Sequence, residues 1–389
     1  MKDKKAALHK GGAAKAAPLR FLHLHSSFDP GGKEARAVRL MNAFGAAATH
    51  AVVSAQPGAT GAMSGIARGI RAQIDEAFPA LQGRPTPGRL LKIAQAMQGH
   101  DLILTYNFGA MDAVMAHTLF GQMLNLPPLV HHEDGFNADE VRRRSRVRNW
   151  YRRVALGRAA ALVVCSQVLE RIARSEWKQP SARIHRIPNG IAIGRFAVKP
   201  KPDSLPRVVK RPGELWVGTM AGLRAVKNLP RLVRAFADLP EPWQLVICGQ
   251  GPEGEAIRAE ADRLNIGHRV HLPGQAADPA QVVGLFDIFA LSSDSEQFPL
   301  SVVEAMAAGL PVASMDVGDV RAIVAEENQR FLAADEAALA DAVTTLARDA
   351  ELRVRIGGAN RARARAQFDE AGMIAAYRAL YARVVGRGF

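Results

Sequence analysis

The sequence predicts an α/β protein made of two doubly wound, Rossmann-like domains that face each other across a cleft. Its 389 residues exceed what one hydrophobic core usually holds, so two domains are expected. Strand-like apolar runs alternate with helix-like runs, and this alternation occurs twice, which is typical of parallel sheets covered by helices on both faces. Between the two series, residues 187–211 carry four prolines and little periodicity, the composition of a linker.

The expected strands divide evenly between the two halves. In the first half they lie at residues 21–25, 50–54, 101–106, 129–132 and 161–166. In the second half they lie at residues 215–219, 244–249, 269–272, 287–292 and 311–315. Helical patterns intervene, for example at residues 228–238, 255–264 and 301–308. Ligands of doubly wound sheets bind beyond the carboxyl ends of the strands, so we expect the functional residues in the loops that follow these runs.

The composition describes an ordinary globular protein, with 48% hydrophobic and 23% charged residues. Cys165 and Cys248 each end an apolar strand-like run, and we expect buried free thiols rather than a disulfide or a metal ligand set. No apolar run approaches the ~20 residues that a membrane-spanning helix needs. Residues 1–18 are basic but lack an apolar core, so we expect a flexible tail rather than a secretory signal, and a cytoplasmic protein.

The formal net charge of +14 belongs to the first half of the chain. Residues 1–195 hold 28 Lys and Arg against 13 Asp and Glu, whereas residues 196–389 hold 23 against 24. The segment from Arg142 to Arg158 contains eight arginines together with Trp150 and Tyr151. Such a segment suits peripheral contact with an anionic membrane, and the alternative is a solvated helix whose arginines pair with acids. We expect no nucleic-acid partner, because the sequence holds no known reader motif.

The stretch from Ser292 to Pro311 carries two carboxylates, Glu296 and Glu304, eight residues apart. Glu296 follows a strand-like run, and Glu304 lies within a segment of good helix formers. Where a strand is followed by a polar loop and then a helix, the helix N-terminus presents backbone N–H groups that bind phosphate readily. Carboxylates beside that terminus can hold hydroxyl groups. The stretch therefore predicts a ligand with both polyol and phosphate groups, such as a nucleotide-sugar.

Two further strand-to-helix loops could bind the same anion. In residues 26–34, Gly31 and Gly32 let the backbone approach a ligand closely, although a glycine pair is equally consistent with a tight turn. In residues 218–228, Arg224 and Lys227 are three apart and could reach the same phosphates. Cations at a helix N-terminus oppose the helix dipole, and an anionic ligand would relieve that conflict.

Two other motifs have competing interpretations. Residues 249–254 match the G-x-G-x-x-G pattern of dinucleotide-binding proteins, but no acid ends the next strand and Pro252 removes one N–H group, which argues against a dehydrogenase. Residues 131–135, HHEDG, follow a strand in the basic half. Adjacent residues on a strand point to opposite faces, so at most one histidine faces the cleft, and a structural histidine is an equal alternative to a ligand.

Together these motifs resemble the family 4 glycosyltransferases, retaining enzymes of the GT-B fold, over most of the chain. The most specific part is Glu296-x7-Glu304 within SEQFPLSVVEAMAAGLPV, which looks like the E-x7-E signature of that family. The GTMAGLRAVKN loop, the IPNG turn, the CGQGPE loop and the glycine pair at residues 31–32 support it. The sequence departs from the family pattern at Gln297, where glycine is common, and at Ala192, where aspartate is common.

The resemblance implies a role for each site residue. Arg224 and Lys227 would bind the donor diphosphate, Glu296 would hold hydroxyls of the transferred sugar, and Glu304 would hold those of the ribose. His132 would complete the catalytic set near the sugar and the acceptor. The other donor-binding residues would be Gly31, Gly32, Gly249, Leu272, Phe298, Pro299, Leu300 and Ser301, and the acceptor side would include His131, Asp134 and Asn107.

The implied activity is metal-independent transfer of a hexose-type sugar, with retention, from a UDP- or GDP-sugar to a lipid-linked or envelope glycan. Residues 19–190 would form the acceptor-side domain, residues 191–365 the donor domain, and residues 366–389 a helix that packs back on the N-terminal domain. The basic half would place the enzyme at the inner face of the cell membrane. The alternatives are a nucleotide-sugar epimerase of the same fold, which needs no acceptor, and a non-catalytic nucleotide-sugar binder.

Overall fold

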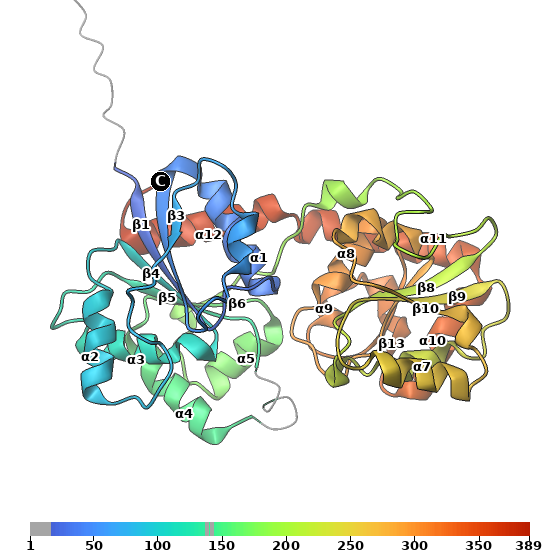
Figure 1. Ribbon diagram of the computed structural model, residues 1–389, viewed down its shortest axis with the longest axis horizontal. Coiled ribbons are helices and arrows are strands. Elements are labelled where there is room, and N and C mark those ends of the chain that lie inside the picture. Colours follow the sequence, from blue (N-terminus) through green and yellow to red (C-terminus); the bar gives the residue numbers. More distant parts are fainter. Residues whose placement is uncertain (1–16, 137–139, 141–143) are drawn as a thin grey trace, which may run out of the picture.

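The structure is a computed structural model that describes residues 17–136, 140 and 144–389. It contains two α/β domains, each built on one parallel sheet, which lie side by side along the longest axis of the molecule (Figure 1). The predicted fold class is therefore confirmed. Most of the expected basic tail, and residues 141–143 of the arginine-rich segment, lie outside the described residues.

The N-terminal sheet has seven parallel strands in the order β3-β2-β1-β4-β5-β6-β7. The strands are β1 (Leu19–His25), β2 (Ala48–Ser54), β3 (Ala72–Ile74), β4 (Leu102–Tyr106), β5 (Leu129–Glu133), β6 (Ala161–Val164) and β7 (Ile184–Arg186). The helices of this domain are α1 (Gly32–Phe44), α2 (Pro87–Ala96), α3 (Met111–Phe120), α4 (Arg146–Ala155) and α5 (Gln167–Ser175). Because every strand is parallel, the functional loops after the strands collect at one end of the sheet.

The C-terminal sheet has six parallel strands in the order β10-β9-β8-β11-β12-β13. The strands are β8 (Leu215–Met220), β9 (Trp243–Cys248), β10 (Val270–Gly274), β11 (Ile288–Leu291), β12 (Val312–Met315) and β13 (Leu332–Ala333). The helices are α6 (Leu229–Phe236), α7 (Gly254–Arg263), α8 (Leu300–Ala308), α9 (Val320–Ile323), α10 (Glu336–Arg348) and α11 (Ala350–Gln367). This order places β8 and β11, whose loops carry the predicted donor residues, beside each other in the sheet.

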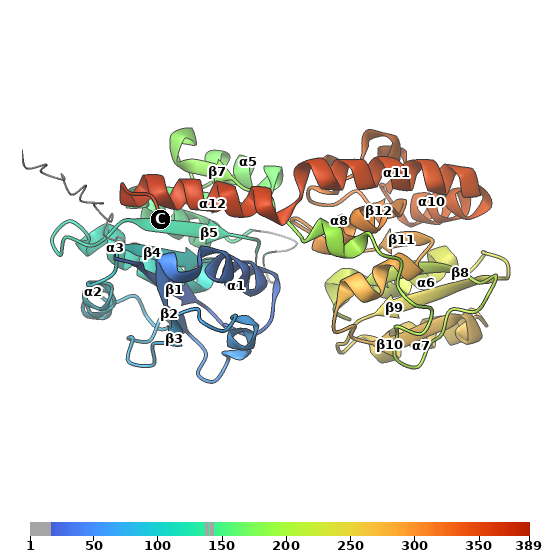
Figure 2. The ribbon, with the colours of Figure 1, turned by 90° about the horizontal axis from the view of Figure 1, so that it is seen from above.

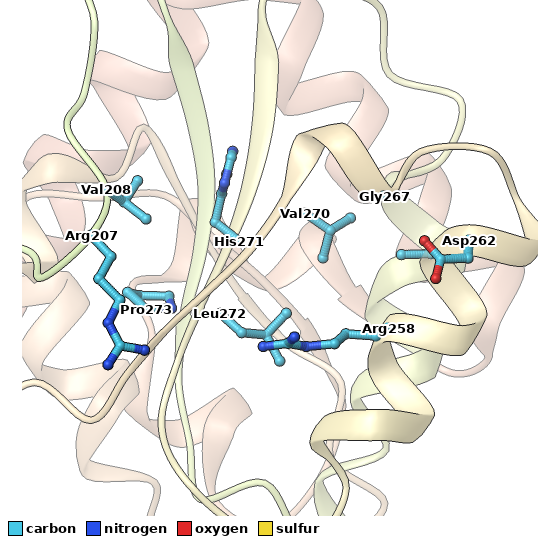
Figure 3. Close-up of a pocket in the computed structure, with 10 residues that line it drawn as sticks. Arg207, Val208, Arg258, Asp262, Gly267, Val270, His271, Leu272 and Pro273 are labelled. Carbon is cyan, nitrogen blue, oxygen red and sulfur yellow. The ribbon is translucent and has the colours of Figure 1, made fainter.

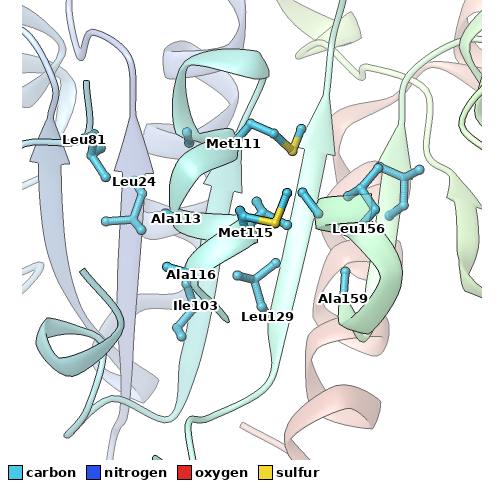
Figure 4. Packing of buried hydrophobic residues seen from close by; sticks show 14 of the residues in the cluster. Leu24, Leu81, Ile103, Met111, Ala113, Met115, Ala116, Leu129, Leu156 and Ala159 are labelled. Carbon is cyan, nitrogen blue, oxygen red and sulfur yellow. The ribbon is translucent and has the colours of Figure 1, made fainter. Parts of the chain in front are cut away.

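Apolar side chains cover both faces of each sheet, as parallel sheets require. In the N-terminal domain, Leu24, Ile103 and Leu129 of three neighbouring strands share one cluster with Met111 and Met115 of α3 (Figure 4). Removing one such side chain would leave a cavity in a close-packed interior, at a cost of about 2–5 kcal/mol for a change to alanine.

All ten expected strands are present, with ends that differ by two residues or fewer. The structure adds three short strands that the sequence pattern did not predict: β3, β7 and β13, with three, three and two residues. Alternation of apolar and polar residues needs four or more positions to be recognised, so strands of this length leave no pattern. Each of them pairs with a neighbour whose position is fixed elsewhere in the sheet.

The chain crosses between the domains twice, and the two crossings are hydrogen-bonded to each other. The Ile191 N–H donates to the Phe368 carbonyl at 2.9 Å. After the second crossing, α12 (Glu370–Val385) lies along the N-terminal domain (Figure 2), where Tyr377 and Tyr381 join the apolar cluster around β1. The last helix of the sequence therefore completes the core of the first domain.

Cys165 and Cys248 are free and buried, as expected. Burial raises the pKa of the Cys248 thiol to about 12 and that of the Cys165 thiol well above its ordinary value, so both stay protonated at neutral pH. No helix in the described part of the chain is both long enough and apolar enough to cross a membrane.

Candidate functional site

Several hydrogen bonds join the loops that follow β8 and β11, and three of them lie next to the predicted site residues. The Asp294 N–H donates to the Val226 carbonyl at 2.9 Å, and the Ser292 hydroxyl donates to the Lys227 carbonyl at 2.9 Å. The third bond joins two side chains, because Lys227 Nζ lies 2.5 Å from Glu296 Oε1. The Ser293 hydroxyl also donates to this carboxylate oxygen, at 2.7 Å. The fold thus brings together two residues that are 69 positions apart in the sequence.

Arg224 differs from Lys227 in having an exposed side chain that makes no hydrogen bond or ion pair with any residue the structure describes. The two residues do not share an α-helical turn, because residues 225–227 form a short 3₁₀ turn and α6 begins only at Leu229. Asn228 separates the two segments in a left-handed conformation, with φ of 43°. An unpaired guanidinium beside a paired lysine leaves positive charge available for an anion.

Close packing against the Arg224 loop explains the glycines of the G-x-G-x-x-G motif. A Cβ atom at Gly249 would come within 1.8 Å of the Ala221 carbonyl oxygen, and one at Gly251 within 2.3 Å of the Leu223 carbonyl oxygen. The Leu223 N–H in turn donates to the Gln250 carbonyl at 2.9 Å. The motif therefore supports the loop that carries Arg224, and binding of the donor by Gly249 remains a prediction.

The N-terminus of α8 carries four of the predicted donor-binding residues: Phe298, Pro299, Leu300 and Ser301. Pro299 precedes the first turn, and no side chain caps this helix end. The first N–H groups of a helix have no partner within the helix, so an uncapped end of a nine-residue helix offers donors to a phosphate. Phe298 packs against the apolar clusters of both domains, which places this helix end at the interdomain face.

Glu304 lies one turn further along α8 and is half-buried. Burial raises the pKa of its carboxyl to about 7, although Arg39 of α1 in the other domain acts in the opposite direction. The electrostatic effect of Arg39 shows that this carboxyl is close to the N-terminal domain. Hydrogen bonds donated by ligand hydroxyls would stabilise the ionised carboxylate of Glu304, because they would replace the bonds to water that burial removes.

On the N-terminal domain, the Gly31–Gly32 pair begins α1, with Gly31 at the N-cap position. The buried Glu34 side chain reaches back over this position, so a Cβ atom at Gly31 would lie 2.6 Å from its carboxylate oxygen. Lys33 contacts the same carboxylate, and burial lowers the pKa of Lys33 to about 8. An internal anion and its counter-ion therefore already occupy this helix end, while Gly32 faces open space.

Four buried or half-buried residues form what we call the N-terminal polar network: Arg36, Asn107, Asp134 and Asn189. Arg36 donates from Nη2 to the Asp134 carboxylate at 2.8 Å and from Nη1 to the Asn189 side chain at 2.9 Å. The Asn107 side chain accepts from the Asp134 N–H at 2.7 Å. Burial acts to raise the pKa of Asp134, but the Arg36 guanidinium outweighs it and holds the pKa below its ordinary value.

Both predicted histidines are buried, and their contact with the sugar or the acceptor remains a prediction. His132 Nε2 lies 2.8 Å from the Tyr381 hydroxyl of α12, and burial lowers the pKa of His132 to about 3. His131 points to the opposite side of β5, where it contacts the Thr105 hydroxyl at 2.8 Å and Glu133 at 3.3 Å. The two histidines alternate as strand neighbours must, but α12 and α4 close over the two faces.

The sequence motifs did not point to several residues that the structure places at the interdomain face. These residues are Lys33, Glu34, Arg36, Arg39 and Asp319. The only sequence signal of the first four is the run of charges that follows the glycine pair, and a charged helix start usually faces solvent. Asp319 lies outside that run and belongs to no motif noted in the sequence. Arg36 finds its carboxylate 98 positions away, and no local pattern records such a contact.

Leu272, which the resemblance placed near the base, lines a cavity of about 430 Å³ at the edge strand β10 (Figure 3). Arg258 of α7 and Arg207 of the linker approach the same cavity. This edge is separated from the β8 and β11 loops by β9, so contact between Leu272 and the base remains a prediction. In the described part of the chain, no group of three or more His, Cys, Asp or Glu residues could hold a metal ion.

Comparison with known families identifies both halves of the chain. Residues 30–195 match the model of glycosyltransferase family 4, and residues 201–363 match that of the glycosyl transferases group 1. The chain belongs to the family 4 group of GT-B glycosyltransferases, and the resemblance seen in the sequence is confirmed.

Individual relatives match over part of their length. EpsF of Bacillus subtilis (strain 168) is 29% identical over 250 residues, which cover 58% of this chain and 64% of EpsF. The phosphatidyl-myo-inositol mannosyltransferase of Mycobacterium leprae (strain TN) is 32% identical over 179 residues, which cover 43% of this chain and 46% of that protein. The chain thus spans about half the length of the curated relatives it matches.

Solved structures extend the fold comparison to nearly the whole chain. Alr3699/HepE of Anabaena in complex with UDP superposes with a TM-score of 0.74 at 22% identity, covering 92% of this chain and 98% of HepE. HepE has also been crystallised with UDP-glucose. At this identity the comparison shows the shared two-domain fold.

Proposed function

We propose that this chain is a retaining glycosyltransferase that moves a hexose-type sugar from a UDP- or GDP-sugar to a lipid-linked or envelope glycan. One observation carries the proposal: Arg224, which is unpaired among the described residues, flanks the Lys227–Glu296 pair close to the uncapped start of α8. A nucleoside diphosphate supplies the anion for the cations and the helix end, and the attached sugar supplies hydroxyls for the carboxylate.

Donor binding would exchange the partners of the Lys227–Glu296 pair. Lys227 would move to the diphosphate, and Glu296 would then accept hydrogen bonds from hydroxyls of the sugar. Arg224 and Lys227 would stabilise the charge that develops on the leaving diphosphate, and such preorganised electrostatic stabilisation is usually the largest single contribution to catalysis. Glu304 would hold the ribose.

The reaction would proceed on one face of the sugar. The C1–O bond to the diphosphate breaks first and gives an oxocarbenium-like ion pair. A leaving phosphate oxygen takes the proton of the acceptor hydroxyl while the acceptor oxygen bonds to C1, so the configuration is retained. Neither glutamate acts as a nucleophile or a general acid. Because two protein cations neutralise the diphosphate, we expect activity in EDTA, and strict dependence on a divalent metal would contradict this scheme.

On the acceptor side we propose Asp134, rather than His131 or His132, as the residue that contacts sugar or acceptor hydroxyls. Its carboxylate is 16% exposed, whereas both histidine side chains are buried. Arg36 and the Asn107 side chain hold Asp134 in place. His132 would act as a positioning residue that ties β5 to α12 through Tyr381.

The test combines binding and product analysis. A thermal-shift screen against UDP-, GDP- and ADP-sugars identifies the donor, since a ligand at 100 times its Kd adds about 2.7 kcal/mol to the free energy of unfolding. Incubation with that donor and a lipid-linked glycan should then yield free nucleoside diphosphate and a glycosylated acceptor of retained configuration. An epimerised sugar nucleotide would instead indicate an epimerase, and binding without any product would indicate a non-catalytic binder.

We further propose that the N-terminal domain contacts an anionic membrane through adjacent parts of α3 and α4. The support is an accumulation of exposed apolar side chains. Eight large apolar side chains in the described part of the chain are exposed. Leu119, Val147, Trp150 and Val154 lie on these two helices, and Met123 lies in the turn that follows α3. The helices touch where the Thr118 hydroxyl donates to the Ala155 carbonyl. One relative is named a phosphatidyl-myo-inositol mannosyltransferase, and a lipid acceptor for this chain would agree with such a surface.

The charges of α4 sort into three groups. Arg152 turns inward, is completely buried, and pairs with Glu133 and Glu140, so it cannot meet a lipid as the sequence suggested. Arg148 pairs with Glu140, and Arg144, which lies just before the helix, pairs with Glu176. Arg146 and Arg153 are exposed, and the structure gives their side chains no partner in the part of the chain that it describes, which leaves both for anionic headgroups.

Sedimentation with vesicles tests this surface. The wild-type protein should bind vesicles that contain anionic lipid more strongly than neutral ones. W150A should weaken that binding because Trp150 is 63% exposed and is the only aromatic side chain among these exposed residues. V354A, at an exposed apolar site on α11 of the other domain, is the control. Equal binding to both kinds of vesicle would remove the basis of the membrane proposal.

A further inference from the structure

Asp319 stands at the N-cap position of α9, but its side chain caps a helix of the other domain. Its two carboxylate oxygens accept the N–H groups of Gln167 at 2.5 Å and of Val168 at 3.1 Å, the first two residues of α5. It makes no side-chain bond to its own helix, as an N-cap aspartate usually does. Ser166 accepts the next N–H of α5, from Leu169, at 3.0 Å.

The first turn of α5 is therefore capped jointly by its own domain and by the opposite one. The Asp319 side chain also brings a negative charge to the positive end of the α5 dipole. Asp319 is only 5% exposed, so little water competes for these bonds. A buried charge-assisted contact of this kind is stronger than a neutral hydrogen bond at the surface.

The loop that carries Asp319 is attached directly to the loop of Glu296. The Asp319 N–H donates to the Gln297 carbonyl at 3.1 Å. Gly318 adopts a φ of 57°, and a Cβ atom there would lie 2.4 Å from the Glu296 carbonyl oxygen, so only glycine fits this approach. Any shift of Asp319 relative to α5 would thus displace the backbone on both sides of Gln297.

Two further contacts join the Glu296 loop to the N-terminal domain. Phe298 packs against the apolar cluster of each domain. Gly135, which follows Asp134, faces the Gln297 side chain so closely that a Cβ atom would come within 3.2 Å of Gln297 Cγ. The Glu296 loop is therefore held from both sides, by Asp319 and by the segment after β5.

We propose that Asp319 is a positioning residue that ties the Glu296 loop to α5 and so sets the interdomain geometry in which donor and acceptor meet. The proposed effect of Asp319 on catalysis rests on the proposed glycosyl transfer, whereas its proposed effect on the interdomain geometry does not. The carboxylate touches no reacting group in this scheme. It acts through the angle between the domains and through the backbone of the loop that holds the donor sugar.

Interdomain distances provide the first measurement. Spin labels at R174C on α5 and E327C in the C-terminal domain report the distance between the domains, because both sites are exposed while Cys165 and Cys248 are buried and protonated. D319A should broaden or lengthen the distance distribution. D319N, which keeps one acceptor oxygen but loses the charge, should give an intermediate result.

Two control variants separate the interdomain contact from helix capping as such. S166A removes the intradomain cap of the same α5, and D335A removes the cap that Asp335 gives to its own helix α10. Both should lower the melting temperature but leave the interdomain distances as in the wild type. If either control broadens the distances as much as D319A does, loss of a helix cap explains the effect and the proposal is overturned.

Kinetics provide the second measurement. D319A should lower kcat on the order of 10-fold or more, because misplacing reacting groups by about 1 Å is costly. Affinity for UDP should stay within about threefold, since Arg224, Lys227 and the start of α8, which we propose hold the diphosphate, lie in the C-terminal domain. Unchanged distances and unchanged kcat in D319A would overturn the inference. Broadened distances in a protein that transfers no sugar would leave it intact and overturn the proposed function instead.

Discussion

The two sides of the interdomain site use their charges differently. On the C-terminal domain, Arg224 is exposed and unpaired among the described residues, and Glu304 is half-buried without a bonded cation. On the N-terminal domain, Arg36 and Asp134 are locked to each other and to two asparagines. One side is arranged to receive an external ligand, whereas the other is arranged to hold its own shape.

This difference follows from where each set of charges lies in the fold. The Arg224 and Glu296 loops follow neighbouring strands, and the ion pair between their site residues, Lys227 with Glu296, joins two side chains that would exchange partners when an anion binds. The N-terminal polar network lies between β4, β5, α1 and the interdomain crossing, where an unpaired charge would be costly. Changes of pH and single substitutions should therefore affect the two domains differently.

Acid should destabilise the N-terminal domain before the C-terminal one. His23, His25, His50 and His132 are buried there, and burial lowers the pKa of His50 to about 4 and that of His132 to about 3. The unfolded chain binds protons below its ordinary pKa of 6.5 while the folded chain does not, so stability falls as pH drops from 6.5 towards 4. Each such histidine costs about 2 kcal/mol at pH 5.

Calorimetry and hydrogen exchange at pH 7 and pH 5 measure this effect domain by domain. Exchange should rise first in β1, β2, β4 and β5. The C-terminal sheet should change less, because His268 is exposed and His271 is only half-buried. Equal loss of protection in the two sheets would contradict the contrast between the domains.

R36M should lower the stability of the folded protein. It leaves the half-buried Asp134 carboxylate without its cation, and breaking a fully buried ion pair from one side costs about 3–5 kcal/mol, which is the upper bound here. Urea denaturation followed by tryptophan fluorescence measures the change. R39M is the control, because Arg39 is about one-third exposed and its pair with Glu370 should contribute little.

R224A should have the opposite profile, with activity lost and stability kept. Removal of one donor that stabilises the transition state costs about 2.7–4 kcal/mol in activation free energy. The melting temperature should stay as in the wild type because Arg224 is exposed. R258A, which removes an exposed arginine of α7 in the same domain, should retain full activity. Turnover by R224A at the wild-type rate would show that the anion binds elsewhere.

E304Q should change the pH dependence of stability by a smaller amount. Since burial raises the pKa of Glu304 from 4.5 to about 7, the unfolded chain releases this proton first. Stability is then lost as pH rises from about 4.5 to about 7. The amide cannot ionise, so E304Q should gain about 1–2 kcal/mol over the wild type at pH 8 and little at pH 4.5. E326Q, at an exposed position, should show no such gain.

The fold and half of the site could be predicted from local patterns. Ten strands were recognisable because apolar runs of four or more residues persist in any context, whereas β3, β7 and β13 are held by neighbours and leave no such run. Arg224, Lys227, Glu296 and Glu304 were recognisable because each belongs to a loop that directly follows a strand or to the helix that opens from it.

The other half of the site depends on contacts between distant segments. The pairing of Arg36 with Asp134 spans 98 positions, and that of Asp319 with Gln167 spans 152. The inward turn of His131 and His132 depends on α4 and on α12, the last helix of the chain. The position of a residue at a strand end therefore shows that its side chain could reach the site. It does not show whether a distant helix packs over that side chain and buries it.

Local patterns in the sequence were enough to predict two parallel α/β domains, the excess of positive charge in the first, and two strand-to-helix segments that carry two cations and two carboxylates. These features depend on the periodicity of apolar residues and on short spacings between motif residues, and both can be read from short segments of the chain. Only the tertiary structure decided which charges are satisfied internally and which remain for a ligand. That decision requires knowing what packs against each group, because burial and the nearest counter-charge together set whether a charge is stable without a partner.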